Sequence, residues 1–393
     1  MIRRLCTIVG MLFAVALLLT GPAAHKAAAA QARTQALPRI VYGFDREFPP
    51  FSFEEAGGKA VGFEVELLEA ILSGTANLML RPMQWENVSL ELSANTIQVA
   101  SGMVQTAERE KLYLFPEKPT FSLQIRMFTK TYNRFPNLSF LRGQKVSVEQ
   151  ASYQHRLLER YSGFNIKTFK DKASPLKALY TDEVTAYCAP VQSAYYYMNK
   201  LGYSGITTMG TPLGITQLRY AVNRDRGDIV RLINAGFAKI VANGEYDRIY
   251  KKWFVRELTN EETSALINAA KSGVQAAYVP YSHKPTGAAV LAATGKIYYG
   301  AMVENADKNV SISALSAAVA AAVSAGDLEL RAAVSLDKDA SVVELAPGEL
   351  QLLYEFDRGI LALGRGANGT VTQKMVGELL PKPVTAKPAF SVQ

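Results

Sequence analysis

The chain has 393 residues, of which 49% are hydrophobic and 20% are charged, and its formal net charge is +8. This composition argues against extensive disorder, and the length is typical of two or three folded domains. No block of lysine and arginine is present that would indicate binding to nucleic acid.

The first 31 residues have the pattern of a signal peptide. A pair of arginines is followed by an apolar run at residues 8–20 and then by small residues. Cleavage is predicted near Ala30 or Ala32, which places the mature chain in the periplasm with a net charge of +5. An uncleaved membrane anchor is the other interpretation, although the glycine and proline after the apolar run make a poor spanning helix.

From residue 38 the sequence alternates between strand and helix patterns. Residues 40–44 form a compact apolar strand, and the prolines that follow fix the backbone in extended conformations. Residues 62–72 then place apolar side chains at helical spacing. This alternation predicts an α/β fold with a mainly parallel sheet covered by helices.

The stretch 101–109 follows an apolar run and combines small and hydroxyl residues with Arg109. A strand that ends in small residues exposes backbone N–H groups, and an arginine one turn later offers a planar fork of donors that suits a carboxylate. The stretch therefore predicts a site for a small anion. An ordinary strand–turn–helix junction with a solvated arginine is the alternative.

Potential metal ligands are scarce after the leader. Cys188 is the only cysteine there, and it is predicted to be a small buried hydrophobic residue because one thiol cannot form an internal disulfide. The two histidines, His155 and His283, lie far apart in the sequence, so a zinc site of the usual Cys/His type lacks ligands. No metal and no cofactor are predicted.

Five segments follow one another in the order GFDREFPPFSF, GKAVGFEVELLEAI, MQWE, SGMVQTAERE and GEYDRIYKKWF. Together they resemble the family 3 extracellular solute-binding proteins, which bind amino acids for ABC importers. The resemblance implies a two-lobed periplasmic-binding-protein fold of type II over residues 37–257. Lobe one would comprise about 37–128 and 223–257, and lobe two about 131–219.

The resemblance also implies strand crossings between the lobes, near Phe128–Tyr132 and Arg219–Asn223, and a ligand site. Arg109 matches the arginine that grips the ligand carboxylate, and Ser101 and Gly102 would offer hydroxyl or backbone contacts.

Three further residues of lobe one match the family's site. Phe48 and Trp85 match its aromatic walls, and Asp45 matches an acidic residue that meets the far end of some ligands. Each has an alternative interpretation, because buried aromatic residues are common in cores and an aspartate often caps a turn.

Lobe two departs from the family pattern. Ser152 or Tyr153 matches the strand-to-helix loop that also meets the carboxylate. However, Ala189 or a neighbour stands where amino-acid binders carry an aspartate for the α-ammonium, and Val104 replaces a frequent serine or threonine. Because an ammonium without an acceptor is costly in a closed cleft, a carboxylate without the amine fits better. The alternative is that Glu183 supplies the missing charge.

After residue 254 the character of the sequence changes. The segments AAYVPYSHKPTGAAV, GKIYYG and VENA, and later LYEF and ELLP, are similar to cytidine deaminase. This resemblance covers about residues 262–384 and implies a three-layer α/β/α cytidine deaminase-like domain. Residues 381–388 are proline-rich, and residues 385–393 are predicted to be a flexible tail.

The chemistry of a deaminase is not retained. Such an enzyme needs a zinc-bound water and a glutamate that moves the proton. The family's Cys-Ala-Glu run aligns with Ser313, Ala314 and Leu315, and its paired cysteines align with Ala346 and Glu349. The domain is therefore predicted to be a pseudoenzyme, either a scaffold for self-association or a degenerate nucleoside pocket.

Some of the residues that contact the substrate in this family are also replaced. Met302 stands in place of a ribose-binding asparagine and Lys284 in place of a phenylalanine that walls the base pocket. Glu304 is retained, and it would either hold a substrate hydroxyl or cap a helix.

The sequence alone is compatible with three functions. The first is periplasmic binding of a small carboxylate for an ABC permease or a membrane sensor, and we expect this one. The second is a zinc-dependent nucleoside deaminase with an atypical site. The third is a structural or interaction protein in which both clefts are vestigial. Homo-oligomerisation through the C-terminal domain is a further possibility.

Overall fold

The computed structural model describes residues 37–133, 135, 137–161, 163–366, 368–380 and 382–385. The predicted leader, residues 1–31, and the predicted tail from residue 386 onward lie outside the described residues. Within the described part, no helix combines the length and the apolar character needed to cross a membrane.

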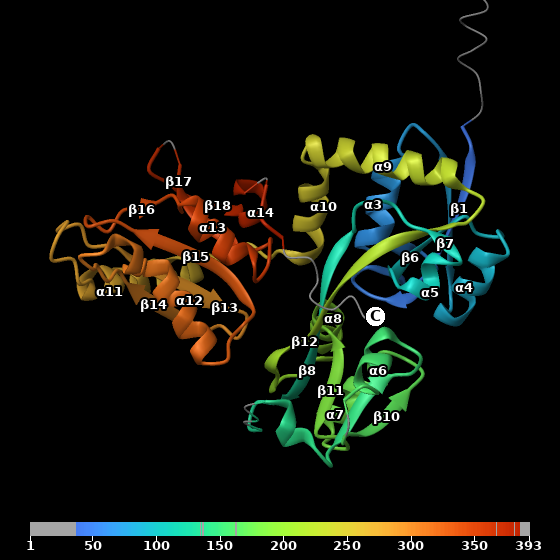
Figure 1. Cartoon of the computed structure of the whole chain (residues 1–393), viewed down its shortest axis with the longest axis horizontal. Coiled ribbons are helices and arrows are strands. Elements are labelled where there is room, and N and C mark those ends of the chain that lie inside the picture. The colour runs from blue at the N-terminus through green and yellow to red at the C-terminus, as the bar shows by residue number, and fades with distance from the viewer. Residues whose placement is uncertain are drawn as a thin grey trace, which may run out of the picture.

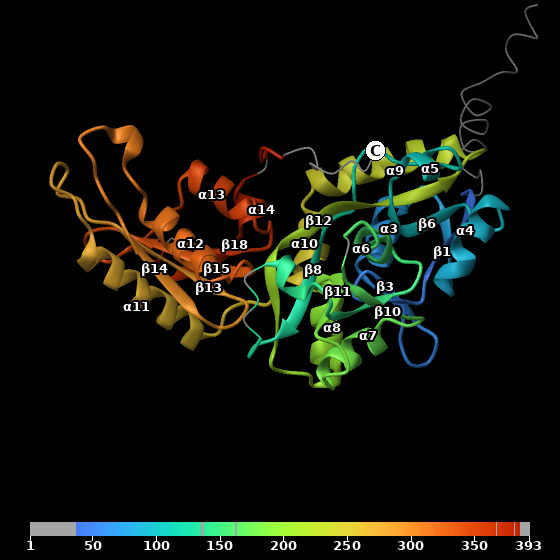
Figure 2. The same cartoon turned by 60° about the horizontal axis from the view of Figure 1, so that its bottom comes forward.

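The structure has two lobes and a C-terminal domain, and the chain passes from lobe one into lobe two and back before it enters the C-terminal domain (Figures 1 and 2). A nine-stranded sheet in the order β10-β9-β11-β8-β12-β6-β1-β5, with β7 beside β12, runs through both lobes. Its strands are β1 (Arg39–Asp45), β5 (Asn77–Met83), β6 (Val99–Val104), β7 (Tyr113–Leu114), β8 (Phe121–Lys130), β9 (Lys145–Glu149), β10 (Asn165–Phe169), β11 (Ala186–Pro190) and β12 (Ile206–Asn223). The predicted α/β fold of two lobes is confirmed.

Lobe one is built on the parallel neighbours β5, β1 and β6. Alternate residues of β1, Ile40, Tyr42 and Phe44, are fully buried in the same hydrophobic cluster as Leu67 and Leu68 of the first helix. The helices of this lobe are α3 (Phe63–Leu72), α4 (Trp85–Ser93), α5 (Ala107–Glu110), α9 (Gly227–Ala242) and α10 (Glu245–Phe254), and a small sheet is formed by β2 (Glu47–Phe48), β3 (Ser52–Glu54) and β4 (Ala60–Val61).

Lobe two places β9 between the parallel strands β10 and β11. Cys188 of β11 is fully buried, as predicted from the sequence. Pro190, the last residue of β11, is directly followed by a helix, because its missing N–H suits the start of a helix. The helices of this lobe are α6 (Tyr153–Leu158), α7 (Ala173–Tyr180) and α8 (Val191–Leu201), with a short 3₁₀ helix at Leu138–Leu141.

The points at which β8 and β12 cross between the lobes lie earlier in the sequence than predicted. In β8, residues 125–128 already pair with β11 of lobe two, so the chain crosses at about 121–125 rather than at Phe128–Tyr132. In β12, residues 214–218 pair with this crossing segment, which likewise precedes the predicted Arg219–Asn223. Both strands continue from one lobe into the other without a break in the strand, so the sequence does not mark the crossing.

The C-terminal domain has its own six-stranded sheet in the order β14-β13-β15-β17-β18, with β16 beside β15. Ala289 and Leu291 of β13 lie in one hydrophobic cluster with Leu266 of α11, and Ala288 and Val290 lie in another with the residues of α12 and α13. Helices therefore cover both faces of the sheet, which confirms the predicted α/β/α layers. The elements are α11 (Asn260–Ala276), β13 (Gly287–Ala292), β14 (Ile297–Ala301), a 3₁₀ helix (Lys308–Val310), α12 (Ala314–Ser324), β15 (Leu330–Leu336), β16 (Val342–Val343), α13 (Pro347–Tyr354), β17 (Leu361–Arg365), β18 (Val371–Met375) and α14 (Val376–Leu379).

Replacing Gly300 with alanine is expected to destabilise this domain. An added Cβ at Gly300 would meet the backbone oxygen of Ala314 at 2.2 Å, so β14 and α12 could not keep their present contact. We expect a loss of about 1–3 kcal/mol in the free energy of unfolding, measured by chemical denaturation. Gly348→Ala is the control, since a Cβ there meets open space, and an equal loss in both variants would contradict the expectation.

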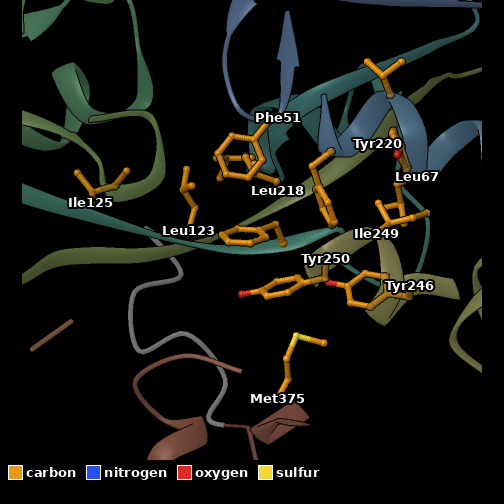
Figure 3. Packing of buried hydrophobic residues seen from close by; sticks show 14 of the residues in the cluster. Phe51, Leu67, Leu123, Ile125, Leu218, Tyr220, Tyr246, Ile249, Tyr250 and Met375 are labelled. Atoms are coloured by element: carbon orange, nitrogen blue, oxygen red, sulfur yellow. The ribbon is translucent and has the colours of Figure 1, made fainter. Parts of the chain in front are cut away.

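The C-terminal domain contacts both lobes. Arg126 of β8 pairs with Glu329, which precedes β15, at 3.0 Å, and Tyr250 of α10 donates a hydrogen bond of 2.9 Å to Asp357. Figure 3 shows the apolar part of this contact, where Met375 lies beside Tyr250 in the cluster that also fills lobe one. The domain is thus packed against the two lobes on the side where the strands cross.

Candidate ligand-binding site

A cavity lies between the lobes, where the ends of β6 and β9 face each other. It encloses about 540 Å³ of empty space, including its open mouth. Seven of the eight predicted site residues line it: Asp45, Phe48, Trp85, Gly102, Arg109, Ser152 and Tyr153.

Arg109 is held at the cavity by its local structure. Thr106 caps the short helix α5 by accepting a hydrogen bond from the Arg109 backbone N–H, and the guanidinium donates to the carbonyl of Val104 at 2.9 Å. The guanidinium also lies over the Trp85 ring, 5.9 Å from its centre. Burial and the nearby charge of Arg156 lower the pKa of Arg109 to about 10, so it remains a cation at neutral pH.

Arg109 is the unbalanced charge of the cavity. Among the described residues, no carboxylate lies within ion-pair distance of its guanidinium. A half-buried guanidinium with donors to spare favours an anionic ligand, because it would otherwise remain only partly compensated.

Ser101 does not line the cavity. Its side chain is buried, and its hydroxyl accepts a hydrogen bond of 2.6 Å from Tyr42 in the core of lobe one. The side chains of a strand alternate between its faces, so Ser101 points to the core while Gly102 faces the cavity.

Gly102 lines the cavity. Its N–H already donates to the buried carboxylate of Glu64 at 2.9 Å, so the backbone contact predicted for it is not available to a ligand. Its positive φ of 70° and a clearance of 3.3 Å between an added Cβ and the Phe48 ring explain why glycine fits here.

The aromatic residues Phe48 and Trp85 are half-buried. Phe48 packs on Phe51 with ring centres 4.9 Å apart, and Trp85 begins helix α4 and packs against a hydrophobic cluster of lobe one. Each therefore combines a packing role with a face on the cavity.

Ser152 and Tyr153 form part of the lobe-two wall. Ser152 caps helix α6: its hydroxyl accepts a hydrogen bond from the N–H of His155 at 3.1 Å and donates to the carbonyl of Glu149 at 2.8 Å. Because both roles of the hydroxyl are taken, Ser152 shapes the loop. Its neighbour Tyr153 presents its side chain at the cavity.

The most strongly charged part of the cavity was not predicted from the sequence. Lys172, at the start of α7, extends its ammonium to Asp45 of lobe one at 2.6 Å and to Glu149 of lobe two at 2.7 Å. Burial alone would lower the pKa of Lys172, but the two carboxylates outweigh it and raise the pKa above its ordinary value. Lys172 therefore stays charged and joins the lobes.

Asp45 acts as a turn cap, which is one of its two predicted roles, and it also lies on the cavity wall. One carboxylate oxygen accepts a hydrogen bond of 2.9 Å from the N–H of Glu47, as a turn cap does. The other oxygen is bound to Lys172 at the cavity wall.

The end of β11 carries no acid at the position of the family's aspartate. Ala189 is buried, and its neighbour Pro190 lines the cavity at the end of β11. Glu183, the alternative source of charge, is about half exposed and pairs with Lys167 on the surface of lobe two. The hypothesis that Glu183 supplies the acid is therefore wrong, because the end of α7 turns it away from the cavity.

The two lobes touch beside the cavity. Ser193 of α8 donates a hydrogen bond of 2.7 Å to the carbonyl of Pro49, and Tyr197 donates one of 3.2 Å to the carbonyl of Glu47. Together with the ion pair of Lys172, these bonds hold the lobes in a closed arrangement.

The positions of the C-terminal domain that align with the zinc ligands of deaminases carry other side chains. Ser313 caps α12 by accepting a hydrogen bond from Ser316, and Ala346 precedes α13 and donates its N–H to Glu349 at 3.1 Å. One hydroxyl, one methyl group and one engaged carboxylate do not fit a zinc ion. In the described part, no group of three or more His, Cys, Asp or Glu residues could hold a metal.

Glu304 has a structural contact in this domain. Its carboxylate accepts hydrogen bonds of 3.0 Å from the backbone N–H groups of Tyr281 and Ser282. It therefore stabilises a loop and does not cap a helix, which is the structural role predicted for it.

Two regions of the chain match known protein families. Residues 40–256 match bacterial extracellular solute-binding proteins, family 3, and residues 245–346 match the cytidine and deoxycytidylate deaminase zinc-binding region. The L-cystine-binding protein TcyJ of Escherichia coli (strain K12) is 24% identical over 225 residues, which cover 56% of this chain and 84% of that protein. The arginine-binding periplasmic protein of Mannheimia haemolytica is 25% identical over 214 residues, covering 52% and 87%.

Solved structures of other proteins are similar in fold to the two lobes. An ancestral arginine-binding protein bound to arginine has a TM-score of 0.51 and 27% identity, and the match covers 55% of this chain and 98% of that one. A histidine kinase sensor domain with similarity to periplasmic binding proteins has a TM-score of 0.52 and 23% identity, covering 56% and 96%. Both predicted resemblances are confirmed.

Proposed function

Since this chain belongs to the bacterial extracellular solute-binding proteins of family 3, we propose that it binds a small carboxylate-bearing solute between its lobes. The solute is an amino acid or a related organic anion. The observation that carries this proposal is Arg109, a cation at the cavity wall with no carboxylate partner among the described residues.

The cellular setting follows from the same proposal. The leader pattern of residues 1–31 supports export to the periplasm, and the relatives include a periplasmic arginine-binding protein and cystine-binding proteins. The bound solute is passed to an ABC permease or reported to a membrane sensor.

For the C-terminal domain we propose a deaminase fold without deaminase activity. The side chains of Ser313, Ala346 and Glu349 support this, because none of them is a thiolate or an imidazole. The domain would then serve the protein through its packing against both lobes, or through self-association. Metal analysis of the purified protein and a cytidine assay test this proposal, and bound zinc with turnover of cytidine would contradict it.

Replacing Arg109 with methionine is expected to weaken ligand binding by about 30-fold or more, because a desolvated charge pair is lost. Calorimetric titration with amino acids, keto acids and dicarboxylates measures the effect. Lys111→Met is the matched control, since this exposed lysine lies two residues away. Unchanged affinity in the Arg109 variant would contradict the proposed site.

A structural role with a vestigial cleft is the second candidate. It is favoured by one observation, that Lys172 pairs with both carboxylates of the cavity and joins the lobes. Native mass spectrometry of the purified protein separates the two functions. A small acid retained through purification supports solute binding, and no binding from the whole titration panel supports the structural role.

A further inference from the structure

Lys172 supplies a cation at the place where a ligand's own cation would bind. Its ammonium lies between a carboxylate of lobe one and a carboxylate of lobe two, at 2.6 Å from Asp45 and 2.7 Å from Glu149. It also lies 5.5 Å from the centre of the Phe48 ring, which forms part of the same wall. The side chains of Lys172, Asp45 and Glu149 are only 11%, 6% and 13% exposed.

Each oxygen of the two carboxylates already accepts a hydrogen bond from the protein. Asp45 uses one oxygen for Lys172 and the other for the N–H of Glu47. Glu149 uses one oxygen for Lys172 and the other for the side-chain amide of Gln154, at 3.3 Å. An ammonium brought by a ligand would therefore have to displace Lys172 from an arrangement that is already complete.

Outside the cluster of Lys172, Asp45 and Glu149, the charged residue of the cavity wall is a cation. Asp45 and Glu149 are the acids of the cavity wall, and Pro190 stands at the end of β11 where no acid is available. The cations of the wall are Lys172, which is paired, and Arg109, which is not. A carboxylate ligand compensates Arg109, whereas an ammonium on the same ligand finds no acceptor and loses its hydration.

We infer that Lys172 is the specificity-determining residue of the cleft: by filling its acidic subsite, it selects small carboxylates that carry no ammonium group. This inference rests on the proposed solute-binding function and narrows its substrate class from amino acids to amine-free organic acids. Because Lys172 and Asp45 belong to different lobes, the same ion pair closes the cleft around such a ligand.

The test compares matched ligands that differ only by an ammonium group. Calorimetric titrations of the full chain use glutarate against glutamate, and propionate against alanine. The wild-type protein is expected to bind the amine-free acid of a pair at least about tenfold more tightly, the ratio that corresponds to 1.4 kcal/mol of differential affinity. In Lys172→Met, Asp45 and Glu149 become free to accept an ammonium, and this ratio is expected to fall by at least about tenfold.

Lys170→Met is the control, since Lys170 is an exposed lysine two residues away, and its ratio is expected to equal that of the wild type. The ratio is the decisive readout, because a general loosening of the cleft would weaken both ligands of a pair alike. Wild-type protein that binds glutamate or alanine as tightly as the amine-free acid overturns the inference, even if the variant does not fold. An unchanged ratio in folded Lys172→Met also overturns it. If no carboxylate binds to the wild type, the proposed function falls together with the inference.

Discussion

Replacing Arg126 with methionine is expected to lower the free energy of unfolding by about 3 kcal/mol or more. The Arg126 side chain is 1% exposed, pairs with Glu329 at 3.0 Å and donates to the carbonyl of Gly210 at 2.7 Å. Its removal leaves the carboxylate of Glu329 in a largely buried place, with the hydroxyl of Thr208 as its remaining side-chain donor among the described residues. Urea denaturation measures the loss.

A double-mutant cycle identifies the pair as the cause. Glu329→Gln is expected to be destabilising as well, and the double variant is expected to lose less than the sum of the two single variants. Arg226→Met is the control, because Arg226 and Asp228 form a more exposed pair that contributes less than about 1 kcal/mol. A loss at Arg126 no larger than that at Arg226 would contradict the buried ion pair.

This pair has a consequence for how the lobes move. Glu329 belongs to the C-terminal domain, which also contacts α10 of lobe one through Tyr250 and Asp357. Arg126 lies just beyond the crossing segment of β8, on the side of lobe two. A rotation of the lobes about the crossing strands therefore changes the distance between groups that now form a buried ion pair.

The local elements of lobe one could be predicted from the sequence because each depends on neighbouring residues. The apolar strand at 40–44 and the helical spacing at 62–72 correspond to β1 and α3. The small residues before Arg109 end a strand, and Thr106 begins the short helix that carries the arginine, as the pattern of 101–109 indicates.

The charged centre of the cavity could not be predicted, because it depends on how the two lobes meet. Asp45 and Lys172 are 127 positions apart in the sequence, and their contact exists only in the closed arrangement. No local pattern distinguishes Lys172 from the exposed Lys170 beside it. The orientation of Ser101 was missed for a similar reason, since its side-chain direction depends on which face of β6 packs on Tyr42.

Glu64 is a second residue whose importance depends on tertiary contacts. In the sequence it is one of several acids at the start of a helical pattern, where an acid is common because of the helix dipole. In the structure it is fully buried, and its two carboxylate oxygens accept hydrogen bonds from Thr120 at 2.6 Å and from Gly102 at 2.9 Å. It thereby supports the strand end that faces the ligand cavity.

Glu64 is expected to make the protein less stable as the pH rises towards and through neutrality. Burial raises the pKa of Glu64 to about 7, against an ordinary value of 4.5, although the two hydrogen bonds oppose the change. Between these two values the folded chain holds a proton that the unfolded chain has lost. The stability linked to this proton is fully present below the unfolded pKa and is lost as the pH rises through the folded pKa.

From about pH 5 to about pH 8 this loss amounts to about 2–3 kcal/mol. Glu64→Gln keeps an oxygen for Gly102 and cannot ionise, so its free energy of unfolding, measured by urea denaturation, is expected to lack this slope. Glu66→Gln on the same helix is the control. Burial alone would raise the pKa of Glu66, but hydrogen bonds from Lys252 and Trp253 lower it, so Glu66 titrates below this pH range. If Glu64→Gln and the wild type lost stability in parallel across the range, Glu64 could not be the titrating group behind the cavity wall.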